Sequence, residues 1–571
     1  MSSDLLEAIV YLSTYQAGGD GRVRGFDPDG SEGTPPIATI PGWTNVTTAL
    51  NPTGTGIRVD IGGGNNDHAD FTTFDPGTLT PGSVVNVYHR VAPYNEKMVI
   101  FKSGTQTDPI IWNGVTNIAG ERPTIDFNNA QTVNPQDSNF TWVAPYGGWV
   151  LTYSRDGGSA TDVTEWNTFK NLRMVNADPT QTDGDNSAPY VDGAAPIRIN
   201  EADHTVFESC IFEDNGNGIF ISSSRANKDV KVRGCKFQGN GVFGSFLEHN
   251  LYFQVVSDTP WENIVEGCFF GALKSGADGV GSCKHRGTDF VFRYNTVIVQ
   301  QRALDIVEAQ DELPDWIWDN LTAQEILDRY RSALVYGNQF FADESAGFDA
   351  AHGIHVGMDT GTGRPGDLDQ RFNTGGSAQD QPMARGYGSP AYIYHNSFYV
   401  NSTTRFNRSF LDLDAGSAGF SQFFSSVEFS NNAFMVEDTD TVNQTNMAHT
   451  RYTGNVTYSG VNHIYMPANV SATMQESSRG VTDPDVTVTG GSSPTLLAQQ
   501  TGIDPLFANV SNTDLEAVDL SLSAGSAAIG QAGSLPSFVS SYQPVGQPIL
   551  AEFGGGVTAR TTANDLGAYE T

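Results

Sequence analysis

A six-residue pattern recurs through the middle of this 571-residue chain and constrains its fold more than any other feature. The pattern reads apolar, any residue, small or polar, Cys or Asn, any residue, apolar. Its copies are centred on Cys210, Cys235, Cys268, Asn295, Asn338, Asn396, Asn432 and Asn455. Successive copies are never closer than 23 residues, and most are further apart. A constant minimum spacing between copies, with extra residues of variable number, predicts a solenoid. In a solenoid, coils of one circumference carry surface loops of different lengths.

Each copy of the pattern predicts a strand, a corner and a second strand. Successive side chains of a strand point to opposite faces, and the apolar alternation changes phase at the Cys or Asn. Asn suits such a bend because it tolerates a left-handed backbone and can hydrogen-bond to the next coil. The predicted fold class is therefore all-β, a parallel β-helix.

The β-helix is predicted over residues 84–571, closing segment included, after an N-terminal cap or small β region at residues 1–83. Residues 311–334 show helical periodicity and predict one short helical insertion. Residues 358–390 have no periodicity and predict a long loop, of a kind that is usually functional.

A third strand follows the corners, and its copies can be aligned by their inward apolar pairs. The segments are 249–253, 282–286, 303–307, 353–357 and 410–414. The alignment turns Cys283 and His285 inward. It also predicts one outward column with members about 4.8 Å apart, the spacing of neighbouring strands. The members of this column are Tyr252, Lys284, Asp305, His355 and Asp412.

Charge excludes some partners. The formal net charge of −34 argues against nucleic acid or an anionic membrane as partner.

No apolar run approaches the roughly 18 residues that a membrane span needs. The start of the chain, with Asp4 and Glu7, lacks the basic region of a secretory signal. We expect an acidic protein that acts outside the cell or on the surface of a virion, without a signal peptide in this sequence.

Two ends of the chain resemble a known group. Tyr94, Glu96, the run Ser103–Thr105 and the run Gly120–Asp126 resemble the opening coil of bacterial right-handed parallel β-helix proteins. The segments DPLF, LSAGSAAIGQAG and DLGAYE resemble the closing segment of the same group. The resemblance covers roughly residues 84–571 and implies a right-handed coil, but fold alone does not fix a reaction.

Within that group, the segment SCKHRGTDFVFRYNT resembles polysaccharide lyases of the pectate, alginate and chondroitin lyase type. In the alginate and chondroitin lyases a catalytic Lys precedes a strand that ends in Arg-x-Asn-Thr, and Lys284 fits that place. The family has an Arg and a His on the following coil, where this chain has Asp305 and Glu308. It also has acidic calcium ligands before the Lys, where this chain has only Asp278. The acid and metal roles therefore do not carry over.

The chemistry of β-elimination suggests roles for the column. The reaction needs a base, a cation that neutralises the uronate carboxylate, and a proton donor for the leaving oxygen. We expect Lys284 to be the base, Tyr252 or His285 the donor and Arg286 the neutralising cation, with Asp305 beside them. The structural alternative is an exposed Lys284–Asp305 ion pair worth under about 1 kcal/mol. The predicted substrate-binding residues are His249, Arg302, Glu308, His355, Asp412 and Asp414.

The leading expectation is thus binding and depolymerisation of an acidic, uronate-containing polysaccharide, and two alternatives stay open. Asp412 and Asp414 are two residues apart, about 6.8 Å along a strand. With Asp305 they approach the separation of about 6.5 to 9.5 Å found in inverting glycosidases. The other alternative is a non-catalytic tailspike or adhesin that grips glycans, as a monomer or a homotrimer.

No metal or organic cofactor is predicted. His352 and His355 are an odd number of residues apart, so one strand face cannot present both to a transition metal. Calcium held by loop carboxylates is compatible with the composition but has no motif here.

Overall fold

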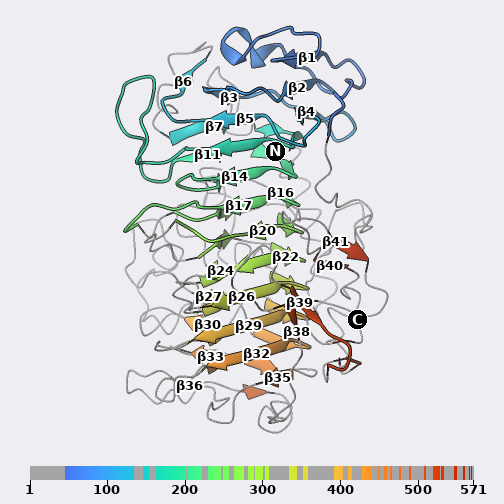
Figure 1. The fold of residues 1–571 in the computed structure, drawn as a ribbon, viewed down its shortest axis with the longest axis vertical. Coiled ribbons are helices and arrows are strands. Elements are labelled where there is room, and N and C mark those ends of the chain that lie inside the picture. Colours follow the sequence, from blue (N-terminus) through green and yellow to red (C-terminus); the bar gives the residue numbers. More distant parts are fainter. Residues whose placement is uncertain are drawn as a thin grey trace, which may run out of the picture.

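The computed structural model shows a stack of β-strand coils (Figure 1). The described residues are 46–133, 146–152, 163–200, 202–221, 229–245, 248–255, 263–274, 281–287, 290–299, 302–307, 333–343, 352–357, 391–402, 409–414, 427–438, 446–450, 456–458, 463–465, 475–476, 488–489, 507–509, 519–526, 529–530, 532, 546–548, 557–559, 565 and 568. The loop predicted at 358–390 lies outside them. So does the helix predicted at 311–334, apart from residues 333 and 334, which open a strand.

Three long sheets contain most of the described strands. The thirteen-stranded sheet runs in spatial order through β1 (Arg58–Ile61), β2 (Val84–Tyr88), β4 (Ile110–Val115), β9 (Asn167–Lys170), β13 (Val206–Glu208), β16 (Lys231–Arg233), β19 (Asn263–Glu266), β22 (Phe290–Arg293), β25 (Ala333–Tyr336), β28 (Ala391–Tyr394), β31 (Val427–Ser430), β34 (Val456–Tyr458) and β37 (Val488–Thr489). The ten-stranded sheet runs through β5 (Thr124–Asp126), β10 (Arg173–Val175), β14 (Ile211–Glu213), β17 (Lys236–Gln238), β20 (Phe269–Phe270), β23 (Thr296–Ile298), β26 (Gln339–Asp343), β29 (Ser397–Ser402), β32 (Ala433–Asp438) and β35 (His463–Tyr465).

The twelve-stranded sheet holds the predicted polar column. It runs through β6 (Gln131–Thr132), β3 (Glu96–Ile100), β7 (Gly147–Leu151), β11 (Ala195–Ile199), β15 (Ile219–Ile221), β18 (Leu251–Val255), β21 (Cys283–Gly287), β24 (Arg302–Val307), β27 (His352–Gly357), β30 (Ser409–Asp414), β33 (Asn446–Thr450) and β36 (Gln475–Glu476). Smaller elements are the parallel pair β8 (Thr164–Glu165) and β12 (Ala202–Asp203), the antiparallel pairs β38 (Phe507–Asn509) with β39 (Asp519–Leu522) and β40 (Gly546–Pro548) with β41 (Val557–Ala559), and the 3-10 helices η2 (Phe71–Thr73) and η3 (Pro76–Thr78).

From β9 to β36, each coil gives one strand to each long sheet in turn. The strands β19, β20 and β21 form one such coil, and β22, β23 and β24 form the next. Their counterparts pair in parallel in all three sheets. The predicted fold, a right-handed parallel β-helix, is confirmed. No helix in the described part of the chain is long and apolar enough to cross a membrane.

The predicted hydrogen bonds between corner residues of successive coils are confirmed, but the expected left-handed backbone of the Asn is wrong. The residue before the corner Asn has the positive φ instead, for example 56° at Tyr294 and 66° at Gly337. The corner amides then form a ladder of Nδ2 to Oδ1 hydrogen bonds from coil to coil. The bonds are 3.1 Å from Asn295 to Asn338, 3.0 Å from Asn338 to Asn396 and 3.1 Å from Asn396 to Asn432. Asn455 lies outside the described residues.

The corner cysteines extend the same row toward the N-terminus. Cys210, Cys235 and Cys268 are buried and free, as is Cys283. Burial raises the pKa of the Cys210, Cys235 and Cys283 thiols well above its ordinary value. These protonated thiols form a row of small buried groups that pack as apolar side chains.

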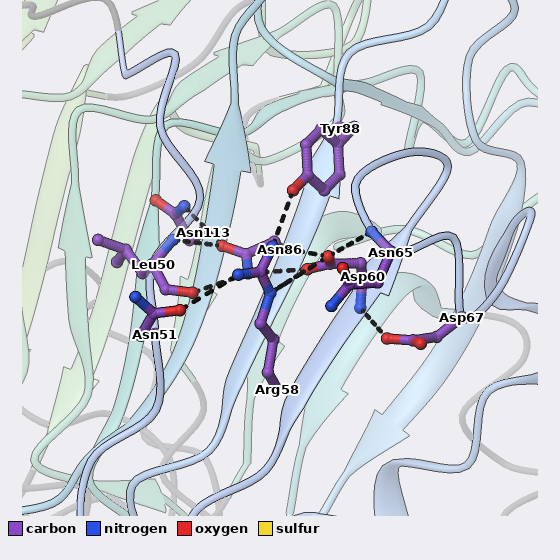
Figure 2. Close-up of polar contacts among 9 residues, drawn as sticks. All are labelled: Leu50, Asn51, Arg58, Asp60, Asn65, Asp67, Asn86, Tyr88 and Asn113. Carbon is purple, nitrogen blue, oxygen red and sulfur yellow. Dashed lines mark hydrogen bonds and ion pairs between the residues drawn. The ribbon is translucent and has the colours of Figure 1, made fainter.

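Asp60 on β1 is the centre of a polar cluster at the N-terminal end of the stack (Figure 2). It accepts hydrogen bonds from Nε and Nη2 of Arg58 at 2.9 and 2.8 Å, from Nδ2 of Asn86 at 3.0 Å and from the backbone N of Asn65 at 2.7 Å. Burial alone would raise the pKa of Asp60, but these donors together lower it. Because β1 pairs with β2, the sheet continues across the predicted boundary between residues 83 and 84, which stays a prediction.

The C-terminal hairpin packs against the outer face of the ten-stranded sheet. Phe507, Leu520 and Leu522 join one apolar cluster with outward side chains of that sheet, such as Phe341 and Tyr399. The hairpin therefore covers an apolar strip that would otherwise meet water.

Candidate functional site

The predicted column forms a single file on the twelve-stranded sheet. The backbone register pairs Tyr252 with Lys284, Lys284 with Asp305, Asp305 with His355 and His355 with Asp412. Figure 1 shows β24, β27 and β30 stacked in this order. Residues up to 57 positions apart in the sequence are thus direct neighbours in the column.

The column faces away from the apolar core. Leu251, Phe253, Cys283, Leu304 and Ile354, which flank its members along the strands, all belong to the core cluster. Four outward side chains are nevertheless buried, with an exposed fraction of 8% for Tyr252, 4% for Lys284, 0% for Asp305 and 1% for His355. The expected exposed Lys284–Asp305 ion pair is therefore not what the structure shows, because both partners are shielded from water.

Asp305 is the electrostatic centre of this face. Its Oδ1 accepts from Nη1 of Arg302 at 3.2 Å and lies 3.1 Å from Nδ1 of His355. Burial by itself would raise the pKa of Asp305, but the charge of Arg302, the hydrogen bond from His355 and the charge of Lys284 outweigh burial and lower it. The carboxylate is therefore ionised and orients the imidazole of His355, in the way that a carboxylate fixes a catalytic His.

Arg302 reaches this site because the strand alternation is interrupted. Ala303 and Leu304 both lie in the core cluster, although they are consecutive. Arg302 consequently turns to the same side as Asp305, and its Nη1 also lies 3.3 Å from Nδ1 of His355. Arg302 is among the predicted binding residues, but the alignment of apolar pairs, which begins at residue 303, does not reveal this contact.

His285 lies on the inner face, as the alignment of apolar pairs predicted. Its ring stacks on Phe290 with 4.0 Å between centroids, and Phe253 is also nearby. Burial lowers its pKa to about 3. The expected role of His285 as a proton donor is therefore corrected, because its ring is in the core and cannot reach a substrate on the outer face.

Aromatic side chains continue the column toward the N-terminus. Tyr252 stacks on Phe220 at 4.7 Å with an angle of 7° between the rings, and on His249 at 5.6 Å. His249 is buried, and its Nδ1 lies 2.8 Å from the carbonyl of Gly281. His249 therefore supports Tyr252 from beside the column.

The remaining predicted residues are only partly described. In the backbone register, Arg286 pairs with Val307, and Asp414 pairs with Gly357. The side chains of Arg286, Asp412 and Asp414 lie outside the description, and Glu308 lies outside it altogether. Their predicted roles stay predictions.

The sequence reasoning missed the N-terminal extension of the column. Arg198 pairs with Phe220, and Phe220 pairs with Tyr252. The segments PIRIN and GIFIS carry the same apolar alternation as the third-strand segments, so extending the alignment by two coils would have found both residues.

No group of three or more His, Cys, Asp or Glu side chains in the described residues is arranged to hold a metal ion. His355 is occupied by Asp305 and Arg302 as described above. The side chain of His352 lies outside the described part of the structure.

Comparisons with known proteins found similar folds only. No protein-family model and no curated protein sequence matches the chain. Among solved structures, the alginate lyase from Paenibacillus sp. str. FPU-7 is 11% identical with a TM-score of 0.35, covering 68% of this chain and 94% of that chain. The Streptococcus pneumoniae surface protein and adhesin PfbA is 10% identical with a TM-score of 0.37, covering 68% and 87%. Pectate lyase Pel9A is 12% identical with a TM-score of 0.36, covering 92% and 100%. Values this low say nothing about the activity of this chain.

Proposed function

We propose that the outer face of the twelve-stranded sheet binds an acidic polysaccharide and cleaves it by β-elimination. The observation that carries this proposal is the convergence of Arg302, His355 and Lys284 on the ionised carboxylate of Asp305, in one column with Tyr252. Such a column offers a base, cations and a hydroxyl within neighbouring strands, which are the groups that elimination requires.

The contacts favour His355 over Lys284 as the base. The ordinary pKa of an amine is about 10.4, so it is protonated at neutral pH and cannot accept a proton, whereas an imidazole with an ordinary pKa of about 6.5 is readily neutral there. In the neutral ring of His355 with its proton on Nδ1, facing Asp305, Nε2 is the nitrogen that accepts. Lys284 and Arg302 then neutralise the carboxylate of the uronate. This assignment replaces the expected role of Lys284 as the base.

The proposed reaction balances with these groups. Nε2 of His355 takes the proton from the carbon α to the uronate carboxylate. The released electron pair forms a double bond to the β carbon, and the bond from that carbon to the glycosidic oxygen breaks. The hydroxyl of Tyr252 protonates the leaving oxygen, and solvent restores both residues.

The burial of the column favours a second candidate, non-catalytic glycan binding. Lys284, Asp305 and His355 are at most 4% exposed, so catalysis requires this face to open to the polymer. A protein that only grips a glycan has no such requirement. The hydrolytic alternative is weaker, because a general acid needs a raised pKa and the pKa of Asp305 is lowered. Either glycan function is compatible with a protein at the outside of a cell or on a virion.

The test is turnover on a panel of uronate polymers. Elimination leaves a conjugated double bond that absorbs ultraviolet light, whereas hydrolysis gives new reducing ends without that absorbance. We expect absorbance with at least one polymer, its loss in His355→Gln, and partial retention in Lys284→Arg compared with Lys284→Ala. If Lys284→Arg is as inactive as Lys284→Ala while His355→Gln is active, Lys284 is the base after all. Binding without either product would establish the non-catalytic function.

A further inference from the structure

A second cation lies on the outer face, three strands from Lys284. Ile197 and Ile199, on either side of Arg198 in the strand, both belong to the core cluster. Because side chains alternate along a strand, that of Arg198 points outward. In register it is followed by Phe220, Tyr252 and Lys284. The backbone of Arg198 is therefore about 14 Å from that of Lys284 along the column, at about 4.8 Å for each strand.

The surroundings of Arg198 are aromatic. Its guanidinium carbon lies 4.2 Å from the ring centroid of Tyr146 and 4.3 Å from that of Phe220. Its Nε donates to Oδ1 of Asn200 at 3.0 Å. These contacts hold the planar group in one orientation, as a binding site for a planar carboxylate requires.

Among the described residues, no carboxylate forms an ion pair with Arg198. Five other described arginines each pair with a carboxylate, namely Arg58, Arg173, Arg233, Arg293 and Arg302. Burial lowers the pKa of Arg198 to about 10, and the side chains of Tyr146 and Tyr252 act in the opposite direction. The chain has a net charge of −34, yet none of its described carboxylates pairs with this half-buried guanidinium. The guanidinium can therefore bind an anionic group of a ligand.

We propose that Arg198 binds the acidic group of a sugar residue in a distal subsite, about three strands from the residue at Lys284. The subsite takes a carboxylate or a sulfate ester, and Phe220 and Tyr252 form an apolar step between the two charged positions. This inference rests on the proposed function, since it concerns the same polymer and the same face. Arg198 thus contributes to substrate binding and specificity and takes no part in bond cleavage.

The experiment measures kcat/KM on oligosaccharides of graded length from the polymer that the wild type cleaves. Arg198→Gln is expected to lower kcat/KM about ten- to hundredfold for oligomers long enough to span both sites. It should leave the shortest cleaved oligomers unchanged, and Arg198→Lys should restore part of the loss. Lys284→Ala, by contrast, should lower turnover equally at every length. Affinity for chondroitin with and without sulfate separates the two acidic groups, with dextran as the neutral control.

Each outcome separates the subsite from the reaction. Equal loss at all lengths, or no loss with long oligomers, overturns the subsite while the proposed elimination stands. If the wild type binds acidic polymers without cleaving them, the reaction fails, and weaker binding of Arg198→Gln to those polymers but not to dextran still supports the subsite. Absence of binding to any acidic polymer overturns both.

Discussion

A histidine buried in the core, His285, is energetically unfavourable where it lies. Both ring nitrogens of His285 lack a hydrogen-bond partner among the described residues, although one of them must carry a proton. Leaving a buried polar group unsatisfied costs about 1–3 kcal/mol. The His285 ring stacks on Phe290 and so packs in the core like an aromatic side chain, but with two unsatisfied ring nitrogens.

His285→Leu should therefore stabilise the protein, and more so in acid. The pKa of His285 is about 3 in the folded chain and about 6.5 in an unfolded one. As pH falls below about 6.5, only the unfolded chain gains the proton, so wild-type stability falls by up to about 1.4 kcal/mol per pH unit. Melting temperatures of wild type and variant at pH 8 and pH 5 check this. A difference that does not widen at pH 5 would contradict it.

Sequence reasoning located this residue correctly but assigned it a chemical role it cannot have. The apolar alternation of the third strand places Cys283 and His285 on the inner face, because the period of a strand is two. The alternation fails at Arg302, where two consecutive residues enter the core. Burial of the outward side chains at Lys284 and Asp305 could not be predicted either, since it depends on packing rather than on period.

At the scale of elements, the corner amides hold successive coils in register. Asn338 donates through Nδ2 to Asn396 and to the carbonyl of Phe292 at 2.9 Å, and it accepts from Asn295. Each amide in the middle of the ladder is satisfied by its neighbours. The sequence predicted this arrangement because the recurring Asn is visible as a pattern and the ladder needs no information beyond register.

Asn338→Ala should lower the free energy of unfolding by about 2–4 kcal/mol. The change removes several buried hydrogen bonds and leaves Asn295 without its acceptor, at about 1 kcal/mol for each lost bond and more for the stranded amide. Asn128→Ala is the matched control, since Asn128 is exposed on a turn and should lose under about 0.5 kcal/mol. Denaturant unfolding followed by circular dichroism measures both, and equal losses would exclude a special role for the ladder.

The N-terminal edge of the thirteen-stranded sheet depends on the carboxylate of Asp60 (Figure 2). Asp60→Asn should destabilise the protein by about 3 kcal/mol, because it removes the buried partner of Arg58. Asn51→Ala, which removes only an exposed bond to Nη1 of Arg58, should cost under about 1 kcal/mol. The pKa of Asp60 is lowered by folding, so its contribution is present above about pH 4 and fades as pH falls further. The difference in melting temperature between wild type and Asp60→Asn should therefore narrow in acid, and a constant difference would argue against the ionised form.

At the scale of the whole molecule, a strongly acidic protein is proposed to bind a polymer of the same sign. The cations of the binding face, Arg198, Lys284 and Arg302, lie within about 20 Å of one another along the column. The net charge of −34 is the sum over the whole chain. The nearby cations attract the polymer, and the more distant carboxylates repel it. Salt screens interactions over long distances more than those over short distances, so ionic strength weakens the repulsion first.

The affinity for an acidic polymer should therefore pass through a maximum as salt increases. At 0.01 M salt the Debye length is about 30 Å, so carboxylates far from the column repel the polymer. At 0.15 M it is about 8 Å, which screens those carboxylates while leaving direct contacts with Arg198 and Lys284 in place. At 1 M even the contacts are screened, and affinity falls. Titration of wild type with the polymer at these three concentrations checks the prediction, with dextran as the uncharged control. A steady decrease from the lowest salt would mean that the local cations dominate at every distance, and that the acidic surface has no part in selecting the ligand.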